Sequence, residues 1–100
     1  MRTINIAAKF NLGKLLMTRG VNNQIADDTK FAKFVIDSLK RHASGDWGNM
    51  CQEDKAENEL ALWQGNLRIF SAYQTERLPK IWIITEADRS ATTILFPDEY

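Results

Sequence analysis

The hydrophobic pattern of this chain changes period once, from helical spacing before residue 65 to alternation after residue 67. Residues 67–73 alternate position by position, residues 80–85 contain an unbroken apolar run, and residues 92–96 are rich in β-branched side chains. These patterns predict three strands, the middle one central in its sheet. Because short polar segments join them, we expect an antiparallel β-meander.

The clearest helical pattern lies in the first half of the chain. A stripe at i, i+3, i+4 and i+8 predicts a helix that is capped by Asp27 or Asp28 and ends near Gly45. Its apolar members are Phe31, Phe34, Val35 and Leu39.

A further helix is expected from Cys51 to Trp63, stopped by Gly65. Its apolar side consists of Ala56, Leu60 and Trp63.

The N-terminal pattern is shorter. Residues 2–10 place Ile4 and Ile6 at strand spacing, which predicts a short first strand. A short helix should follow from Asn11 to Gly20, with residues 17–23 forming its exit and a polar turn. The chain is therefore expected to be a single α+β domain over residues 1–100, in the order β-α-α-α-β-β-β, with the meander packed against two to three helices.

Composition restricts the functional classes. The formal net charge is zero, so the chain lacks the positive field that drives binding to phosphate backbones, which argues against nucleic acid as a partner. The charge is nevertheless segregated: residues 1–50 carry 8 Lys and Arg against 4 Asp and Glu, and residues 51–100 carry 5 against 9. The single cysteine, Cys51, suits a reducing compartment, and no apolar run is long enough to span a membrane, so we expect a cytoplasmic protein.

Motifs for cofactor or metal chemistry are missing from the sequence. It contains no phosphate-binding glycine pattern, no HExxH or paired CxxC motif and no GxSxG elbow. His42, Asp46 and Cys51 are mixed ligands at loose spacing, which makes a poor zinc site. We expect no cofactor and no metal.

Two loops carry candidate partner-binding residues. In the tight loop 45–48, Trp47 follows Asp46 between two glycines, and it either fills the core or anchors a partner. The hairpin of residues 86–90 is either a solvated turn or a binding tip. In a binding tip, Arg89 could clamp a carboxylate or phosphate, and Glu86 and Asp88 could bind a basic partner.

Three segments carry a resemblance that spans nearly the whole chain. They are MTRGV at 17–21, HASGDWG at 42–48 and WIITEADRS at 82–90, followed by Thr92-Thr93 and Pro97. With them, the chain resembles a widespread group of short, plasmid-related bacterial proteins found on plasmids, prophages and integrated elements. The resemblance implies a mobile-element setting and no catalytic residue.

The predicted topology is also similar to that of RelE-type toxins and other small ribonucleases, which hold RNA with basic and aromatic side chains on a sheet. That similarity implies a metal-independent ribonuclease whose residues would be drawn from Arg68, Lys80, Arg89, His42 and Tyr100. An acidic C-terminal half would repel the RNA backbone.

The leading hypothesis is thus a non-catalytic accessory protein that binds a host or element protein, with inhibition of a host defence system as its narrower form. The discriminating feature is an exposed apolar patch around Trp47 or Trp63, ringed by charge. A homodimer is also open, because the final strand is expected to leave an edge that a second copy could pair.

Overall fold

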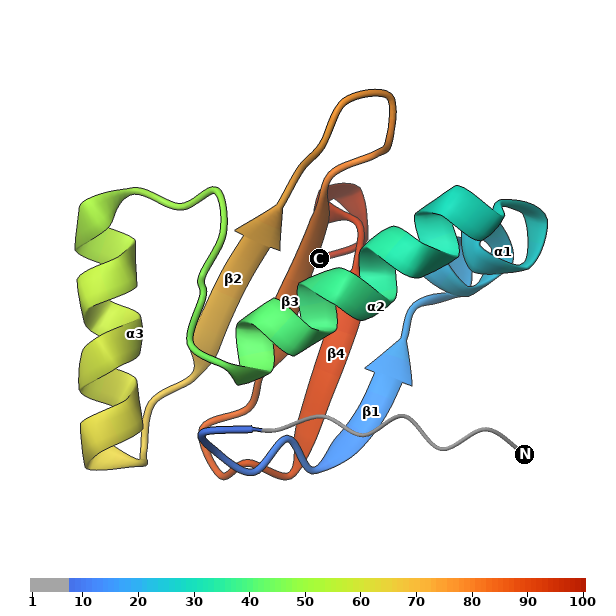
Figure 1. Cartoon of the computed structure of the whole chain (residues 1–100). Coiled ribbons are helices and arrows are strands. Elements are labelled where there is room, and N and C mark those ends of the chain that lie inside the picture. Colours follow the sequence, from blue (N-terminus) through green and yellow to red (C-terminus); the bar gives the residue numbers. More distant parts are fainter. Residues whose placement is uncertain (1–7) are drawn as a thin grey trace.

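The computed structural model describes residues 8–100, and these form a four-stranded mixed sheet with three α-helices (Figure 1). The α+β class is confirmed, and the element types follow the predicted order, although the first strand and the first helix are not the predicted segments. The elements in chain order are β1 (Lys14–Met17), α1 (Arg19–Asp27), α2 (Thr29–Ala43), α3 (Gln52–Gln64), β2 (Ile69–Tyr73), β3 (Ile81–Thr85), β4 (Ala91–Leu95) and a 3-10 turn, η1 (Pro97–Glu99).

The sheet has the strand order β1-β4-β3-β2. The predicted meander is confirmed, because β2 pairs antiparallel with β3 and β3 pairs antiparallel with β4. β1 adds to β4 in parallel, with Leu16 opposite Thr93. The last strand is therefore interior, and the expectation that it leaves an edge is wrong: the outer strands are β1 and β2.

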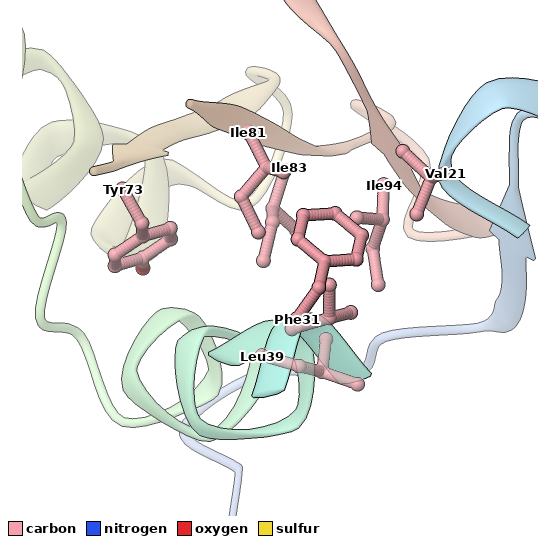
Figure 2. Packing of buried hydrophobic residues seen from close by; sticks show 8 residues of the cluster. Val21, Phe31, Leu39, Tyr73, Ile81, Ile83 and Ile94 are labelled. Carbon is pink, nitrogen blue, oxygen red and sulfur yellow. The ribbon is translucent and has the colours of Figure 1, made fainter. Parts of the chain in front are cut away.

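The main core lies between α2 and one face of the sheet (Figures 1 and 2). The predicted stripe of α2 supplies it, with Phe31, Val35 and Leu39 buried. The sheet contributes alternate residues of its strands, which are Tyr73, Ile81, Ile83 and Ile94. Each such side chain contributes about 1.5–3 kcal/mol by leaving water, so this packing fixes α2 on the sheet.

Asp28 is the N-cap of α2, which resolves the predicted choice between Asp27 and Asp28. Its Oδ1 accepts hydrogen bonds from the backbone N–H of Lys30 at 2.9 Å and of Phe31 at 3.2 Å. Two of the unpaired donors of the first turn are thereby satisfied.

The N-terminal elements differ from the prediction. The predicted strand over residues 2–10 lies mostly outside the described residues, and residues 8–10 are not in a strand. The expected helix from Asn11 to Gly20 is wrong, since Lys14–Met17 form β1 and Gly20 lies inside α1. Parallel pairing with β4 outweighs the weak helical pattern of Leu12, Leu15 and Leu16.

α3 lies beside β2 at one side of the sheet (Figure 1), and its boundaries agree with the prediction. Gly65 is its left-handed C-cap, with φ of 71°. The apolar side predicted for this helix, Ala56, Leu60 and Trp63, faces solvent. The buried residues of α3 are Asn58 and Ala61, whereas Leu60 is 48% exposed and Trp63 is 86% exposed.

Candidate partner-binding surface

The apolar stripe of α3 faces solvent. Ala56, Leu60 and Trp63 follow one another at i, i+4 and i+7, which places them on one side of a helix. All three are exposed, and Asn58 and Ala61 occupy the buried side. We call Ala56, Leu60 and Trp63 the outer stripe. A bare indole on a regular helix, next to a half-exposed leucine, is the kind of apolar surface that marks an interaction site.

Carboxylates border the outer stripe. α3 carries Glu53, Asp54, Glu57 and Glu59 against one cation, Lys55. At 100° per residue, Glu53 and Glu57 fall on one flank of the stripe and Glu59 on the other. The surface that α3 presents is therefore an apolar ridge between acidic borders.

Polar bonds attach α3 to the sheet, together with the packing of Ala61 against Ile69. The side chain of Asn58 brackets the backbone of Phe70, donating from Nδ2 to the carbonyl oxygen at 2.5 Å and accepting from the N–H at Oδ1 at 3.1 Å. Nη2 of Arg89 donates to the carbonyl oxygen of Ala61 at 3.0 Å. These contacts hold the inner side of α3 and leave the outer stripe free.

Trp47, a predicted partner-binding residue, fills the core instead. It is 3% exposed and packs with Ala61 and Ile69. Its Nε1 donates to Oε1 of Glu59 at 3.0 Å, which satisfies the only polar atom of the indole. Of the two interpretations left open by the sequence, the structure supports the core role, and Trp47 is not accessible to a partner.

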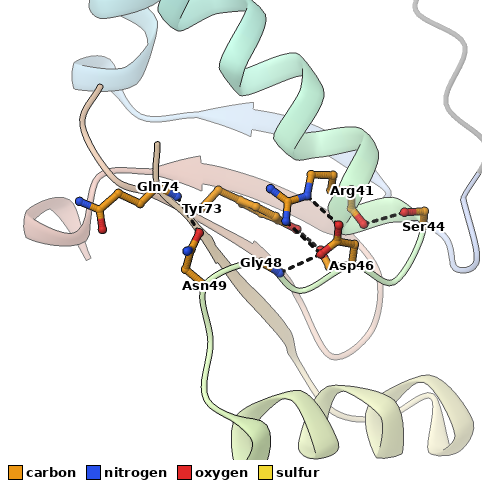
Figure 3. Close-up of polar contacts among 7 residues, drawn as sticks. All are labelled: Arg41, Ser44, Asp46, Gly48, Asn49, Tyr73 and Gln74. Carbon is orange, nitrogen blue, oxygen red and sulfur yellow. Dashed lines mark hydrogen bonds and ion pairs between the residues drawn. The ribbon is translucent and has the colours of Figure 1, made fainter. Parts of the chain in front are cut away.

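Asp46 is exposed but already paired (Figure 3). Its carboxylate accepts hydrogen bonds from Nε of Arg41 at 2.7 Å and from Nη2 at 3.1 Å. The hydrogen bond to Arg41 lowers the pKa of Asp46, and the hydroxyl of Tyr73 donates to the Asp46 carbonyl oxygen at 2.6 Å. The Arg41–Asp46 pair therefore holds the loop that follows α2 against the end of that helix.

The hairpin tip of residues 86–90 is built around Arg89. Its Nη1 donates to the carbonyl oxygens of Leu67, Glu86 and Ala87, at 2.7, 3.1 and 3.1 Å. With the bond to Ala61, the guanidinium joins this turn to the end of α3. Half-buried Glu86 and exposed Asp88 lie in the same turn, and Asp88 accepts from the N–H of Ser90 at 3.0 Å. Arg89 is thus occupied by backbone carbonyls.

The residues implied for a ribonuclease do not meet at one site. His42 is fully buried on the α2 side of the sheet, and Arg89 holds the hairpin turn. Only Arg68 and Tyr100 touch: Nη2 of Arg68 donates to the Tyr100 hydroxyl at 2.8 Å, and its guanidinium lies 5.6 Å from the ring centroid. Tyr100 in turn lies edge-on to Trp82 at 5.8 Å.

A buried hydrogen-bonded chain determines the state of His42. The Thr92 hydroxyl donates to the Leu12 carbonyl oxygen at 2.7 Å, so in its 2.7 Å bond with Thr85 it must accept. The Thr85 hydroxyl therefore accepts from Nε2 of His42 at 2.9 Å, and Nδ1 accepts from the Ser71 hydroxyl. Burial lowers the pKa of His42 to about 3, so the imidazole is neutral and carries its proton on Nε2.

The sequence predicted the outer stripe as the apolar side of α3 but did not determine whether that side packs inward, as such stripes normally do, or faces a partner. One residue could have indicated the orientation of the helix. The side chain of Asn58 has both a donor and an acceptor, so it can bond to the free N–H and C=O of an outer strand as well as to water.

Comparison with known proteins adds no relatives: no protein-family model, no curated protein and no solved structure matches the chain. Within residues 8–100, no helix is long and apolar enough to cross a membrane. The same residues contain no group of three or more His, Cys, Asp or Glu side chains placed to hold a metal ion.

Proposed function

We propose that this protein is a non-catalytic binding module that inserts the outer stripe of α3 into an apolar groove of another protein. The observation that carries the proposal is the 86% exposure of Trp63 on a helix whose apolar side faces away from its own core. A helix laid into a groove is commonly anchored at i, i+3 or i+4, and i+7, and Ala56, Leu60 and Trp63 have this spacing.

Charge defines the partner further. The carboxylates that border the stripe favour a groove rimmed by Lys and Arg, which would steer the encounter and reject acidic surfaces. Trp63 is the expected hot spot, since a buried indole removes about 150–250 Å² from water and tryptophan dominates measured interfaces. Leu60 supplies a second anchor one turn away.

The setting follows from the resemblance to short proteins of plasmids, prophages and integrated elements. It supports an accessory protein of a mobile element that acts on a host or element protein. The narrower form of the proposal is that the grooved partner belongs to a host defence system, which the module inhibits by occupying the groove.

The test begins with affinity capture from a bacterial host and continues with the purified partner. Wild type and Ile36→Ser, a control for an exposed apolar residue on α2, should bind the partner equally, whereas Trp63→Ser should bind it at least about 100-fold more weakly. In the wild-type complex, acrylamide quenching of tryptophan fluorescence should decrease, because Trp63 is the exposed indole that binding would cover.

Glu57→Lys should slow association and reduce its dependence on salt concentration. Equal affinity of wild type and Trp63→Ser for the purified partner would contradict the proposal, provided that circular dichroism shows both chains folded.

A further inference from the structure

The outer edge of β1 carries backbone groups that lack partners among residues 8–100. The N–H groups of Lys14 and Thr18 donate to the carbonyl oxygens of Ser90 and Ile94, on the β4 side. Because successive residues of a strand direct these groups to alternate sides, the N–H and C=O of Leu15 and Met17 point away from the sheet. A strand from another chain could pair with them.

The side chains on this edge are apolar on both faces of the sheet. Leu15 is 50% exposed, Leu16 is 42% exposed and Met17 is 47% exposed. Leu15 and Met17 lie on one face and Leu16 on the other. Edge strands are usually protected by a charge or a proline; β1 has one such residue, Lys14 at its start, and the segment from Leu15 to Met17 has neither.

The opposite edge of the sheet is closed. Asn58 satisfies the backbone of Phe70, while the carbonyl oxygen of Trp47 and the N–H of Asn49 bond to Ala72. Gly48 forms a bridge with Ala72 at φ of 74°, and a Cβ there would clash with the Ala72 carbonyl oxygen and the Tyr73 ring. Among residues 8–100, β1 is therefore the one outer strand left open, so self-association through it would stop at two chains.

We propose that β1 pairs antiparallel with β1 of a second copy of this chain, with the two-fold axis at Leu16. In this register Leu15 of each chain faces Met17 of the other, and each such pair exchanges both of its outward hydrogen bonds. Leu16 meets its own copy across the axis, where the two Cα atoms lie about 4.5 Å apart. The two sheets become one continuous sheet.

A second copy is the favoured occupant because the edge is self-complementary. The register covers all three exposed apolar side chains with one another and places Lys14 opposite Thr18, so no like charges face each other. A closed two-fold pair also needs no further partner. The short contact is at the low end of interface size, below about 1,200 Å², so the dimer is weak and depends on concentration.

Dimerisation through β1 is independent of the proposed function, because α3 lies at the opposite edge, beside β2. The outer stripe remains accessible in both copies. A variant that no longer dimerises can therefore still be tested for partner binding, and a variant that no longer binds the partner can still be tested for dimerisation.

The test is site-specific disulfide formation in a Cys51→Ser background, which removes the native thiol. Leu16→Cys should cross-link on addition of diamide, which accepts the two thiol hydrogens, because the paired Cα atoms fall within disulfide range. Lys14→Cys is the matched control on the same strand. Two copies of residue 14 would lie about 13 Å apart in this register, so they should cross-link at least about tenfold more slowly.

Sedimentation equilibrium provides the second measurement. The average mass of the wild type should rise toward two chains with concentration, and Leu16→Lys, which places two ammonium groups at the axis, should remain a single chain. A wild type that stays monomeric up to millimolar concentration would overturn the proposal. A dimer in which Lys14→Cys and Leu16→Cys cross-link equally fast would overturn this interface.

Discussion

The hydroxyl of Thr18, at the N-terminus of α1, donates a 2.6 Å hydrogen bond to Oε1 of Glu99, which lies one residue from the end of the sequence. The other carboxylate oxygen, Oε2, accepts from the N–H of Gly20 at 3.0 Å. Thr18 itself makes no capping bond from its side chain. The cap of α1 therefore comes from the far end of the sequence, and it fixes η1 to the start of the helix.

Replacing Glu99 by Gln should lower the unfolding midpoint at neutral pH, because the charge at the positive end of α1 is lost. The hydrogen bond from Thr18 lowers the pKa of Glu99 from its ordinary value of 4.5. A lowered carboxyl pKa stabilises the folded state above pH 4.5, and this stabilisation disappears as the pH falls through the lowered value. Urea denaturation at pH 7 and at pH 3 should show the difference between the two chains shrinking at pH 3. The neighbouring Asp98→Asn should leave the midpoint unchanged at both pH values.

His42 should make the protein sensitive to mild acid. Its pKa is about 3 when folded and 6.5 when unfolded, so the unfolded chain binds the proton first and stability decreases as the pH falls below 6.5. Removal of the titrating group in His42→Gln should destabilise the fold at pH 7 by about 1–3 kcal/mol, because Ser71 and Thr85 lose a partner.

The gap between wild type and His42→Gln should then narrow by about 2 kcal/mol between pH 7 and pH 5, because only the wild type loses stability through this group. Urea unfolding at both pH values measures the gap. A gap that does not change with pH would show that the imidazole titrates normally in the folded protein.

Arg89 should be structural rather than part of a binding site. Arg89→Ala removes donors from four carbonyl oxygens in three segments and should lower the free energy of unfolding by about 2 kcal/mol. Hydrogen exchange should increase most at the end of α3. Arg77→Ala is the matched control, because Arg77 is also a turn arginine with positive φ, at 68°, and makes no side-chain hydrogen bond among the described residues. An equal loss of stability in the two variants would mean that the guanidinium bonds contribute nothing.

Asn58 should protect the β2 edge from association. Asn58→Ala leaves the N–H and C=O of Phe70 without partners and should cost about 1–3 kcal/mol of stability. It should also raise light scattering near the unfolding midpoint, because a newly exposed edge can pair with another chain. Asn58→Asp retains the acceptor for the Phe70 N–H but loses the donor to the Phe70 carbonyl oxygen. Its free energy of unfolding, compared with those of wild type and Asn58→Ala, would give the contribution of each of the two hydrogen bonds. Wild-type behaviour of Asn58→Ala would show that the edge is protected by the Trp47–Asn49 loop alone.

The sequence by itself determined the elements whose local pattern agrees with their surroundings. The period of two after residue 67 and the stripe of α2 specify the meander and the helix above it, and Asp28 and Gly65 mark helix ends by backbone chemistry alone. For the candidate site, the sequence indicated only that a binding surface would need an exposed apolar patch near Trp47 or Trp63. In the structure Trp63 is exposed and Trp47 is buried.

Only the tertiary structure decided the features that depend on distant residues. β1 is a strand because β4, more than seventy residues later, offers its backbone. α1 forms despite Gly20, Asn22 and Asn23 because Val21 is buried and Glu99 caps it. α3 turns its apolar stripe outward because the unpaired backbone of Phe70 must bond to Asn58 and the guanidinium of Arg89 to Ala61. Leaving the N–H and C=O of Phe70 unpaired would cost about 1–3 kcal/mol each, which opposes the gain from burying a leucine and a tryptophan, and no local pattern records that balance.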